Sequence, residues 1–312
     1  MNIPSIRRAL IRWYERAQRD LPWRRTRDPY AIWISEIMLQ QTRVAAVIPY
    51  YERFLASFPD ADTLARAPEM QVLAMWSGLG YYSRARNLQK AARQIAGLGE
   101  FPRDYAAIRE LAGVGDYTAA AISSLVFGLP HAVVDGNVRR VIVRLLSDDH
   151  ADVQSHANLL LDRSDPGGWN QALMELGAMV CLPRDPRCGE CPVARQCIAH
   201  RQGTEDTLPA KRAKPAAVRL TRTLLVVHRK GRILLVPSTR VKGFWDLPEA
   251  LKDASPGRTL GEFRHTITHR HYRFIVREAV VGRVPGEGRW WTESQLEKIP
   301  LSTTARKALR FR

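Results

Sequence analysis

The stretch LAGVGDYTA, residues 111–119, lies between two segments with helical periodicity. Its two glycines, Gly113 and Gly115, flank a small apolar residue and allow a tight turn whose backbone amides are unobstructed. Such amides, together with the N-terminus of the next helix, form a site for a phosphate group. The alternative is an ordinary helical hairpin, which the two glycines alone would favour.

The net charge supports the phosphate-binding interpretation. The chain carries 48 Lys and Arg against 31 Asp and Glu, a formal charge of +17, and most of this surplus lies in residues 201–312. Basic chains are attracted to nucleic acid because they displace its condensed counterions. An Arg-rich composition inherited from a GC-rich genome is the alternative explanation. With Tyr117 and Thr118 after the glycines, we interpret residues 111–119 as a helix–hairpin–helix element that binds the DNA backbone.

The first 180 residues show helical periodicity and no long alternation of period two. Asp28-Pro29 predicts a helix start, since it combines an N-cap with Pro at the first helical position. Asp165 predicts another start, and its helix ends just before Cys181. We therefore predict an all-α domain over residues 1–200.

The sequence pattern changes after residue 200. Residues 201–217 are polar, contain Pro and lack periodicity, which is typical of a linker. Beyond them, three segments rich in β-branched residues predict strands, and a final helix is expected near the C-terminus. These elements are Leu224–Val227, Arg232–Val236, Tyr272–Val281 and the helix Thr303–Leu309. We predict an α+β domain over residues 218–312.

The chain has four cysteines, all within 17 residues, with the spacing C-x6-C-x2-C-x5-C. Clustered thiols in a chain without a secretion signal indicate a metal rather than a disulfide framework. Four thiolates hold either a tetrahedral zinc ion or a 4Fe–4S cluster, and ligand chemistry alone does not separate the two. Zinc sites commonly use two CxxC pairs, whereas this chain has one. The ligands are Cys181, Cys188, Cys191 and Cys197.

Two acidic residues are candidates for catalysis. Glu36 lies in WISEIML, residues 33–39, with apolar neighbours around most of the helix, and a buried lone carboxylate is costly unless it is protonated or paired. A salt bridge to an arginine is the alternative. Asp135 precedes a helical segment in VDGNVRRV, residues 134–141, where it could simply be an N-cap. A carboxylate fixed at a helix start can also act in catalysis.

Six ordered motifs and the cysteine spacing together resemble the MutY family of adenine DNA glycosylases, within the endonuclease III superfamily. The motifs span nearly all of residues 1–200. They are LPWR (21–24), WISEIMLQQT (33–42), GLGYYSRARNL (78–88), GVGDYTA (113–119), VDGNVRRV (134–141), NQALMELGA (170–178) and the cysteine quartet.

The resemblance implies a reaction and a set of catalytic residues. Members of the family remove adenine mispaired with 8-oxoguanine. Glu36 corresponds to the acid that protonates the departing adenine and orients water, and Asp135 to the carboxylate that stabilises the cationic sugar. Tyr117 and Asn137 would support that charge. A lysine stands at the position of Tyr117 in strand-cleaving relatives, and a phenol cannot form a Schiff base, so we expect a monofunctional enzyme that leaves an abasic site.

The resemblance also implies residues that contact the substrate. Arg24 and Gln171 match positions around the extruded adenine, and Gln41 and Tyr81 match residues that wedge the gap open. Core packing is the alternative for Tyr81. Further family positions on the DNA are Thr42, Leu79, Gly113 and Gly115. The quartet is expected to hold one 4Fe–4S cluster with a structural role.

The C-terminal domain resembles the Nudix-like domain of the same family. GFWDLPE, residues 243–249, matches a family segment, but no hydrolytic Nudix box follows it, so we expect binding rather than hydrolysis. The lesion-reading Phe-Ser-His of the family corresponds here to Ile267, Thr268 and His269. Thr268 keeps a hydroxyl, while Ile267 replaces an aromatic ring. A β-strand is the structural alternative for this stretch.

The fold class that follows is an all-α helix–hairpin–helix glycosylase domain with a 4Fe–4S cluster loop, linked to an α+β Nudix-like domain. The expected partner is double-stranded DNA with A opposite 8-oxoguanine or G. We expect a cytoplasmic, nucleoid-associated monomer, since no apolar run approaches a membrane span and the N-terminus has no signal core. The alternatives are a glycosylase for another mismatched base such as thymine, and a non-catalytic DNA-binding or redox-sensing iron–sulfur protein.

Overall fold

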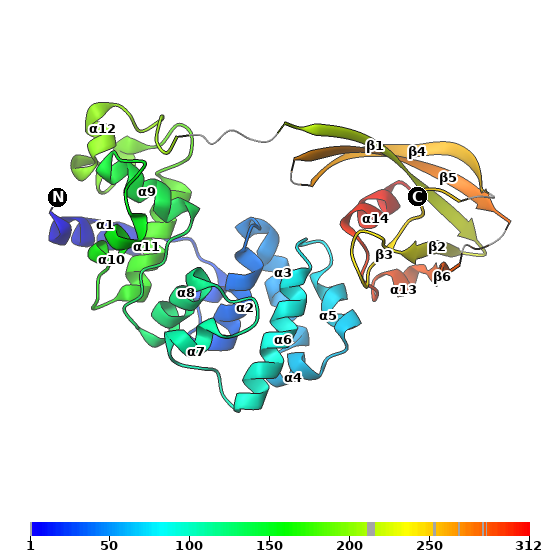
Figure 1. The fold of residues 1–312 in the computed structure, drawn as a ribbon, viewed down its shortest axis with the longest axis horizontal. Helices are drawn as coiled ribbons and strands as arrows, with labels where there is room; N and C mark the ends of the chain where they lie inside the picture. The colour runs from blue at the N-terminus through cyan, green and yellow to red at the C-terminus, as the bar shows by residue number, and fades with distance from the viewer. Residues whose placement is uncertain (1, 211–215, 252–253, 268, 283, 285) are drawn as a thin grey trace. The chain divides into compact units, whose positions relative to one another are not determined.

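The structure is a computed structural model that describes residues 2–210, 216–251, 254–267, 269–282, 284 and 286–312. Helices precede a β-rich C-terminal region, which confirms the predicted order of the two fold types (Figure 1). The chain divides into two compact units. The first comprises Met1–Gln41 and Gln94–Arg212, and the second comprises Thr42–Arg93 and Ala213–Arg312. The domain limits at residues 200 and 218 stay a prediction.

The first unit is helical. Asp28 and Asp165 cap their helices as predicted, and each is followed by Pro at the helix start. The helix that begins after Asp165 is predicted to end just before Cys181, and in the structure it ends at Met179. The helices and 3-10 turns of this unit are α1 (Ile3–Ala17), η1 (Pro22–Arg24), α2 (Pro29–Leu39), α7 (Tyr105–Arg109), α8 (Asp116–Phe127), α9 (Gly136–Leu146), α10 (Val153–Leu160), α11 (Pro166–Met179), η2 (Cys188–Glu190), η3 (Ala194–Gln196) and α12 (Ile198–Gln202).

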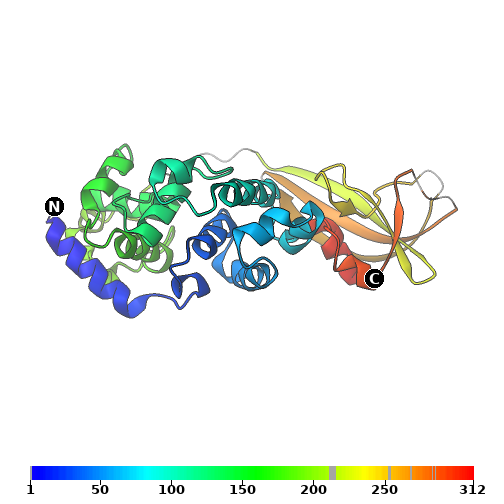
Figure 2. The same cartoon turned by 90° about the horizontal axis from the view of Figure 1, so that it is seen from below.

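The main core of the first unit forms where α1, α9, α10 and α11 pack together (Figures 1 and 2). The α1 helix is amphipathic and buries Ile6, Leu10 and Tyr14 at helical spacing,. The α11 helix contributes Trp169, which is 1% exposed. Since α11 also contacts α8, this core fixes the relative positions of the helices that carry the candidate site.

The second unit joins four helices to the C-terminal region. Pro68-Glu69 and Ser83 mark helix starts, as the turn-forming residues indicate,. The helices are α3 (Val44–Ser57), α4 (Ala61–Arg66), α5 (Glu69–Trp76) and α6 (Ser83–Leu98), followed later in the chain by α13 (Glu293–Leu296), α14 (Thr303–Ala308) and η4 (Leu309–Phe311).

A six-stranded mixed sheet forms the C-terminal part of this unit. The strand order is β3-β2-β1-β5-β4, with β6 paired to β2, and only β1 and β5 run parallel among the described pairs. Alternate residues of β1 and β5 enter two apolar clusters on opposite faces, and α14 covers one face beside β4. The strands are β1 (Val218–Arg229), β2 (Arg232–Pro237), β3 (Trp245–Asp246), β4 (Ala254–Ile267), β5 (Arg270–Val281) and β6 (Arg289–Thr292).

Among the described residues, no helix combines the length and the apolar character that crossing a membrane requires.

Candidate functional site

Glu36 lies in the most buried helix of the candidate site. Every residue of α2 from Tyr30 to Met38 is buried, and Glu36 itself is only 6% exposed. Its Oε2 atom has no hydrogen-bond partner among the residues that the structure describes. Burial raises the pKa of this carboxyl to about 7, against an opposing hydrogen bond from Tyr117, and the charge of Asp135 adds to the rise. Glu36 can therefore carry a proton near neutral pH.

Tyr117 is the second residue of α8, directly after the glycine turn. Its hydroxyl donates to the sulfur of Met174 at 3.6 Å and lies near enough to the carboxyl of Glu36 to lower the pKa of that group. Burial, followed by the charges of Glu36 and Asp135, raises the pKa of the phenol well above its ordinary value. Tyr117 thus stays a neutral hydrogen-bond donor beside the acid.

Asp135 is the N-cap of α9, which is the structural alternative considered for it. Its Oδ1 accepts from Val138 N at 2.7 Å, while its Oδ2 accepts from Asn137 Nδ2 at 3.0 Å. Asn137 Oδ1 in turn accepts from Arg140 Nη2 at 2.9 Å. Both carboxylate oxygens therefore have fixed donors, and the negative charge lies near enough to Glu36 and Tyr117 to raise the pKa of both.

A second buried carboxylate, Glu175, holds the predicted Arg24. Glu175 is 1% exposed and takes paired hydrogen bonds from Arg24 at 2.9 and 3.1 Å and from Arg19 at 2.7 and 2.8 Å. Burial raises the pKa of Glu175, but the arginine hydrogen bonds outweigh it and lower the pKa to about 2. The predicted Gln171 lies one helical turn earlier on α11 and accepts from the hydroxyl of Tyr14.

The sequence interpretation missed Arg19 and Glu175. The signal was present, because Glu175 lies among apolar residues in NQALMELGA just as Glu36 does in WISEIML. A charge in such a setting requires a partner. The structure gives Glu175 two partners, Arg19 and Arg24, which lie on one segment. The predicted substrate residue Arg24 therefore belongs to a charged cluster of three residues.

The predicted hairpin has the backbone geometry that its glycines allow. Gly113 has φ of 78°, which favours glycine, and Gly115 is the N-cap of α8,. A Cβ at Gly115 would meet nothing within 4 Å, so the space beside the start of α8 is open at this residue. The arrangement α7–turn–α8 fits a phosphate.

Both predicted wedge residues have an unusual backbone conformation. Five non-glycine residues within the described segments have a positive φ, and Gln41 at 57° and Tyr81 at 47° are two of them. Such conformations cost free energy and cluster at functional positions. Tyr81 is 53% exposed, which excludes the alternative of core packing for its side chain. Of the neighbouring positions, Leu79 is buried and Thr42 accepts from Arg84 Nη2 at 3.1 Å.

The four cysteines come together around one small cavity. None of them forms a disulfide, and the cavity is also lined by Arg144, His200 and Glu205. Burial raises the pKa of Cys188 to about 11 and that of Cys191 to about 12, and neighbouring sulfurs add to both shifts. Crowded thiols of this kind lose their protons when a cationic metal centre binds.

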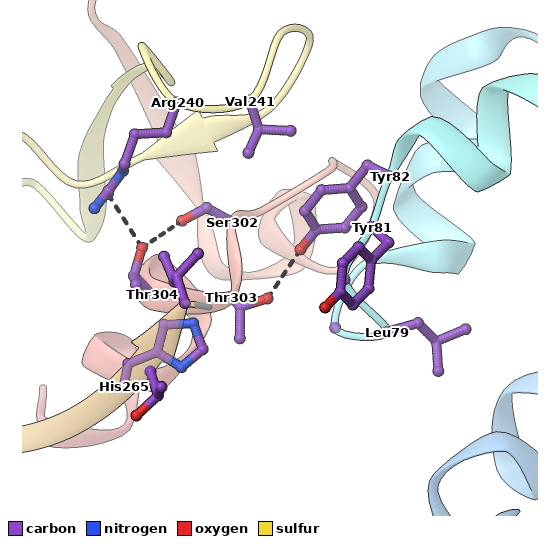
Figure 3. Close-up of a pocket in the computed structure, with 13 residues that line it drawn as sticks. Leu79, Tyr81, Tyr82, Arg240, Val241, His265, Ser302, Thr303 and Thr304 are labelled. Carbon is purple, nitrogen blue, oxygen red and sulfur yellow. Dashed lines mark hydrogen bonds between the residues drawn. The ribbon is translucent and has the colours of Figure 1, made fainter. Parts of the chain in front are cut away.

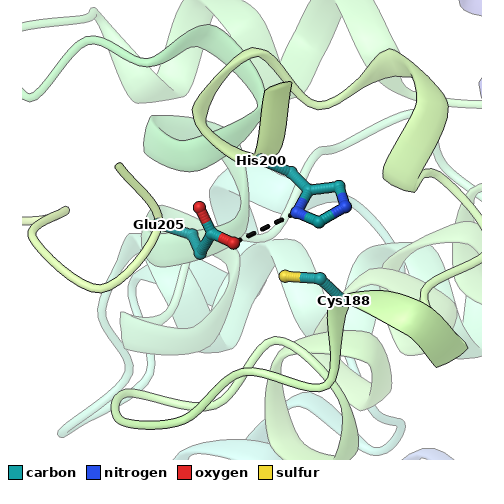
Figure 4. A group of neighbouring side chains, drawn as sticks. All are labelled: Cys188, His200 and Glu205. Carbon is teal, nitrogen blue, oxygen red and sulfur yellow. Dashed lines mark hydrogen bonds and ion pairs between the residues drawn. The ribbon is translucent and has the colours of Figure 1, made fainter. Parts of the chain in front are cut away.

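The donor set fits a four-thiolate metal centre. His200 and Glu205 also lie within 4.8 Å of the sulfur of Cys188 (Figure 4). They bind each other instead, with His200 Nδ1 at 3.1 Å from Glu205 Oε1. Arg144 places Nη1 at 3.2 Å from the sulfur of Cys181, so the charge around the thiols is positive on that side.

Comparison with known proteins identifies the family of this chain. Residues 34–163 match the model of the HhH-GPD superfamily of base excision DNA repair proteins. An adenine DNA glycosylase of Rattus norvegicus is 43% identical over 69% of this chain and 45% of its own length. The adenine DNA glycosylase of Homo sapiens is 32% identical over 99% of this chain and 74% of its own length. The chain belongs to the adenine DNA glycosylase family.

A solved structure of a thermostable thymine-DNA glycosylase is also similar, with 30% identity and a TM-score of 0.60. It covers 64% of this chain and 97% of its own, so the remaining third of this family member has no counterpart there. The match with the rat relative spans less than half of that protein.

The second unit of this family member contains a cavity of about 450 Å³ (Figure 3). Its walls come from the loop around Tyr81 and from the C-terminal region, including His265 and Ile267. Ile267 ends β4, so the strand alternative holds for it, and its side chain is 41% exposed. His269 is exposed and its carbonyl accepts from Val218 N at 3.0 Å. Thr268 lies outside the described residues.

Proposed function

We propose that the chain is a monofunctional DNA glycosylase acting in base-excision repair. It hydrolyses the N-glycosidic bond of adenine opposite 8-oxoguanine or G and leaves an abasic site. The observation that carries the proposal is the buried carboxyl of Glu36 near Tyr117 and Asp135. Burial raises the pKa of this carboxyl to about 7. Family membership supports the same reaction. The proposed partner is double-stranded DNA, which the chain binds as a monomer.

Glu36 is proposed as the general acid. Adenine is a poor leaving group until a ring nitrogen is protonated, and a carboxyl with a pKa near the working pH is the most effective donor. Burial supplies that pKa. After adenine departs, the ionised Glu36 accepts a proton from the attacking water, whose oxygen bonds to the sugar carbon. The products are free adenine and an abasic sugar.

Asp135 is proposed to stabilise the cationic sugar. Two carboxylates in unlike environments can divide the roles of acid and charge stabiliser, as in other glycosidic hydrolysis. Asp135 is held by donors from Val138 and Asn137, which fixes its direction. Tyr117 carries no amine and is proposed to donate a hydrogen bond to the Glu36 carboxyl, which favours release of its proton to the adenine. The phenol of Tyr117 cannot form a Schiff base, so strand cleavage is not part of the proposed reaction.

Extrusion of the adenine is proposed to use the residues with positive φ. Unstacking a base costs a few kcal/mol. Exposed side chains on a fixed backbone can fill the gap, and Gln41 and Tyr81 have that backbone. Arg24 and Gln171 are proposed to contact the extruded base, and the amides after Gly113 and Gly115 the phosphates. Thr42 and Leu79 are proposed as further DNA contacts.

The cysteine quartet is proposed to hold one 4Fe–4S cluster. When bound, such a cluster cross-links the loop from Cys181 to Cys197 and places a charged group beside Arg144. His200 Nδ1 pairs with Glu205 Oε1, and the four free thiols around one cavity support the cysteines as the donor set. No catalytic step is assigned to it.

Residues 218–312 are proposed as a Nudix-like domain that reads the base opposite adenine. Thr268 and His269 are the proposed reading residues, with Ile267 in place of the family's aromatic ring. Hydrolysis is not proposed, because Glu249 forms ion pairs with Arg222 and Arg240 at 3.6 and 3.3 Å. This carboxylate is therefore engaged by arginines rather than grouped with other acids for magnesium.

A single-turnover assay tests the proposal. Duplexes carry A opposite 8-oxoguanine, G, C or T, and released adenine is measured with and without alkali treatment of the strand. We expect adenine release that favours 8-oxoguanine and G, with strand breaks only after alkali. Full activity of Glu36→Gln and Asp135→Asn together would overturn the mechanism. Equal rates on all four duplexes would overturn lesion reading.

A duplex with T opposite G tests the main alternative. The similarity to a thymine-DNA glycosylase motivates this arm. Release of thymine but not of adenine would replace the proposed substrate. The matched control is Glu15→Gln, which changes an exposed glutamate on α1 and should leave release unchanged.

A further inference from the structure

Two adjacent tyrosines of the second unit have opposite environments. Tyr81 is 53% exposed, whereas Tyr82 is 9% exposed. The Tyr82 ring packs on Phe244 with centroids 4.0 Å apart. Its hydroxyl lies 2.9 Å from Thr303 Oγ1 (Figure 3). We propose that Tyr82 and Thr303 form a positioning pair through which the C-terminal region sets the pose of Tyr81 in DNA. The inference rests on the proposed function.

The loop that carries Tyr81 cannot easily absorb a shift. Gly78 has φ of 113°, and a Cβ there would lie 2.1 Å from the hydroxyl oxygen of Tyr50. Trp76 Nε1 donates to Gly80 O at 3.2 Å, and the guanidinium of Arg84 lies 5.6 Å from the centre of the Tyr81 ring. Because these contacts restrain the loop, a displacement of Tyr82 should also displace Tyr81, which is joined to it by one peptide bond.

A second contact holds the other end of the same loop. Ser77 is 2% exposed, and its hydroxyl donates to Leu301 O at 2.6 Å while accepting from Arg306 Nη2 at 3.0 Å. Ser77 and Tyr82 thus attach both ends of the loop to one short segment, residues 301–306. The loop and that segment must move together.

The same segment is tied to the strand that leads to the proposed lesion-reading residues. The buried carboxylate of Asp246 accepts from Ser302 and Thr304 near the start of α14. At the following turn, Lys307 Nζ lies 3.4 Å from Nδ1 of His265, which is two residues before Ile267 on β4. The contacts from β4 through α14 to Tyr82 are therefore continuous.

The test removes one hydroxyl at a time from the pair. Tyr82→Phe and Thr303→Val each abolish the hydrogen bond with little change in shape. Single-turnover adenine release is measured opposite 8-oxoguanine and opposite G, with 2-aminopurine beside the mispair as a fluorescent reporter of unstacking. Loss of one hydrogen bond is expected to reduce the preference for 8-oxoguanine about fivefold. The double variant should match the single ones, since both remove the same interaction.

One control and two outcomes separate this pair from general stability and from the proposed function. Tyr51→Phe removes a hydroxyl from another buried tyrosine of the same unit and should leave the preference and the fluorescence unchanged. Wild-type preference in both pair variants, or additive losses in the double variant, would overturn the pairing while the proposed function stands. Absence of adenine release in the wild type would overturn the proposed function itself. Thr303→Val decides the matter if Tyr82→Phe does not fold.

Discussion

Asn137 donates a side-chain hydrogen bond to Oδ2 of Asp135 at 3.0 Å, and Oδ1 of the same carboxylate caps α9. In this carboxylate, Oδ1 caps the helix and Oδ2 is held by the Asn137 side chain. The capping function and the proposed catalytic function belong to the same residue, so a test has to separate them by chemistry rather than by deletion.

Asp135→Asn separates the two functions. Asparagine caps helices as well as aspartate, so the melting temperature should change little. Loss of the negative charge should slow adenine release roughly 10²–10³-fold, the usual cost of removing one electrostatic group from an active site. Single-turnover kinetics and thermal melting measure the two effects.

The matched control is the N-cap of α10. Asp152 accepts from Ser155 N at 3.1 Å, in the same capping geometry as Asp135. Asp152→Asn should change neither stability nor release. If Asp135→Asn lost activity only in proportion to a loss of folded protein, the carboxylate would be a cap and nothing more.

The pH dependence of release should follow Glu36. Its pKa of about 7 lies above its ordinary value of 4.5, so the acid is protonated below pH 7 and the rate should fall as the pH rises through 7. Tyr117→Phe removes the hydrogen bond that lowers this pKa and should move the fall to higher pH. A rate that stays flat from pH 6 to pH 9 in the wild type would contradict the assignment of Glu36 as the acid.

The same shift predicts a change in stability. Because the pKa of Glu36 is raised on folding, the unfolded chain holds fewer protons between pH 4.5 and 7, and stability falls over this range. The cost of ionising the buried carboxyl reaches about 3 kcal/mol above pH 7. Glu36→Gln removes this cost, so the substitution should change the free energy of unfolding more favourably at pH 8 than at pH 4.5. Urea unfolding at the two pH values measures this.

Glu175 should stabilise the fold in the opposite pH direction. Its two arginine partners lower its pKa to about 2, so the stabilisation is present above its ordinary pKa of 4.5 and is lost as the pH falls toward 2,. Glu175→Gln leaves Arg19 and Arg24 without their buried counter-charge and should cost about 3 kcal/mol at pH 7. The difference from wild type should shrink in acid.

An exposed ion pair provides the control for Glu175. Glu69 pairs with Arg86 at 2.8 Å, but its side chain is 55% exposed. Pairs of this kind contribute about 1 kcal/mol or less. Glu69→Gln should accordingly have little effect on urea unfolding. Equal losses in the two variants would show that burial does not distinguish them.

Local sequence was sufficient for the features that depend on one helix. Asp28 and Asp165 cap their helices because short polar side chains next to Pro determine a helix start locally,. The burial of Glu36 followed from apolar neighbours on all sides of α2, and its 6% exposure confirms it. The partners of Glu36 come from α8 and α9, and their approach depends on tertiary packing.

Other features had no local signal. Gln41 and Tyr81 adopt positive φ although neither is Gly or Asn, because the surrounding structure imposes it,. The strand β4 was not predicted, since its sequence contains Pro256 and two glycines, which normally indicate turns,. Register shifts accommodate them, and a Cβ at Gly261 would lie 2.2 Å from the ring of Phe311.

Arg144 should retain the metal centre that we propose for the cysteines. It is 2% exposed, and its guanidinium contacts the sulfur of Cys181 at 3.2 Å, Leu182 O at 2.7 Å and Leu208 O at 2.9 Å. Groups that orient metal ligands typically change metal retention about tenfold or more when removed. Arg144→Met should therefore release iron to a chelator about tenfold faster, whereas Arg139→Met, which changes an exposed arginine on the same helix, should not. Equal release rates in the two variants would show that the thiols hold the centre without help from the Arg144 charge.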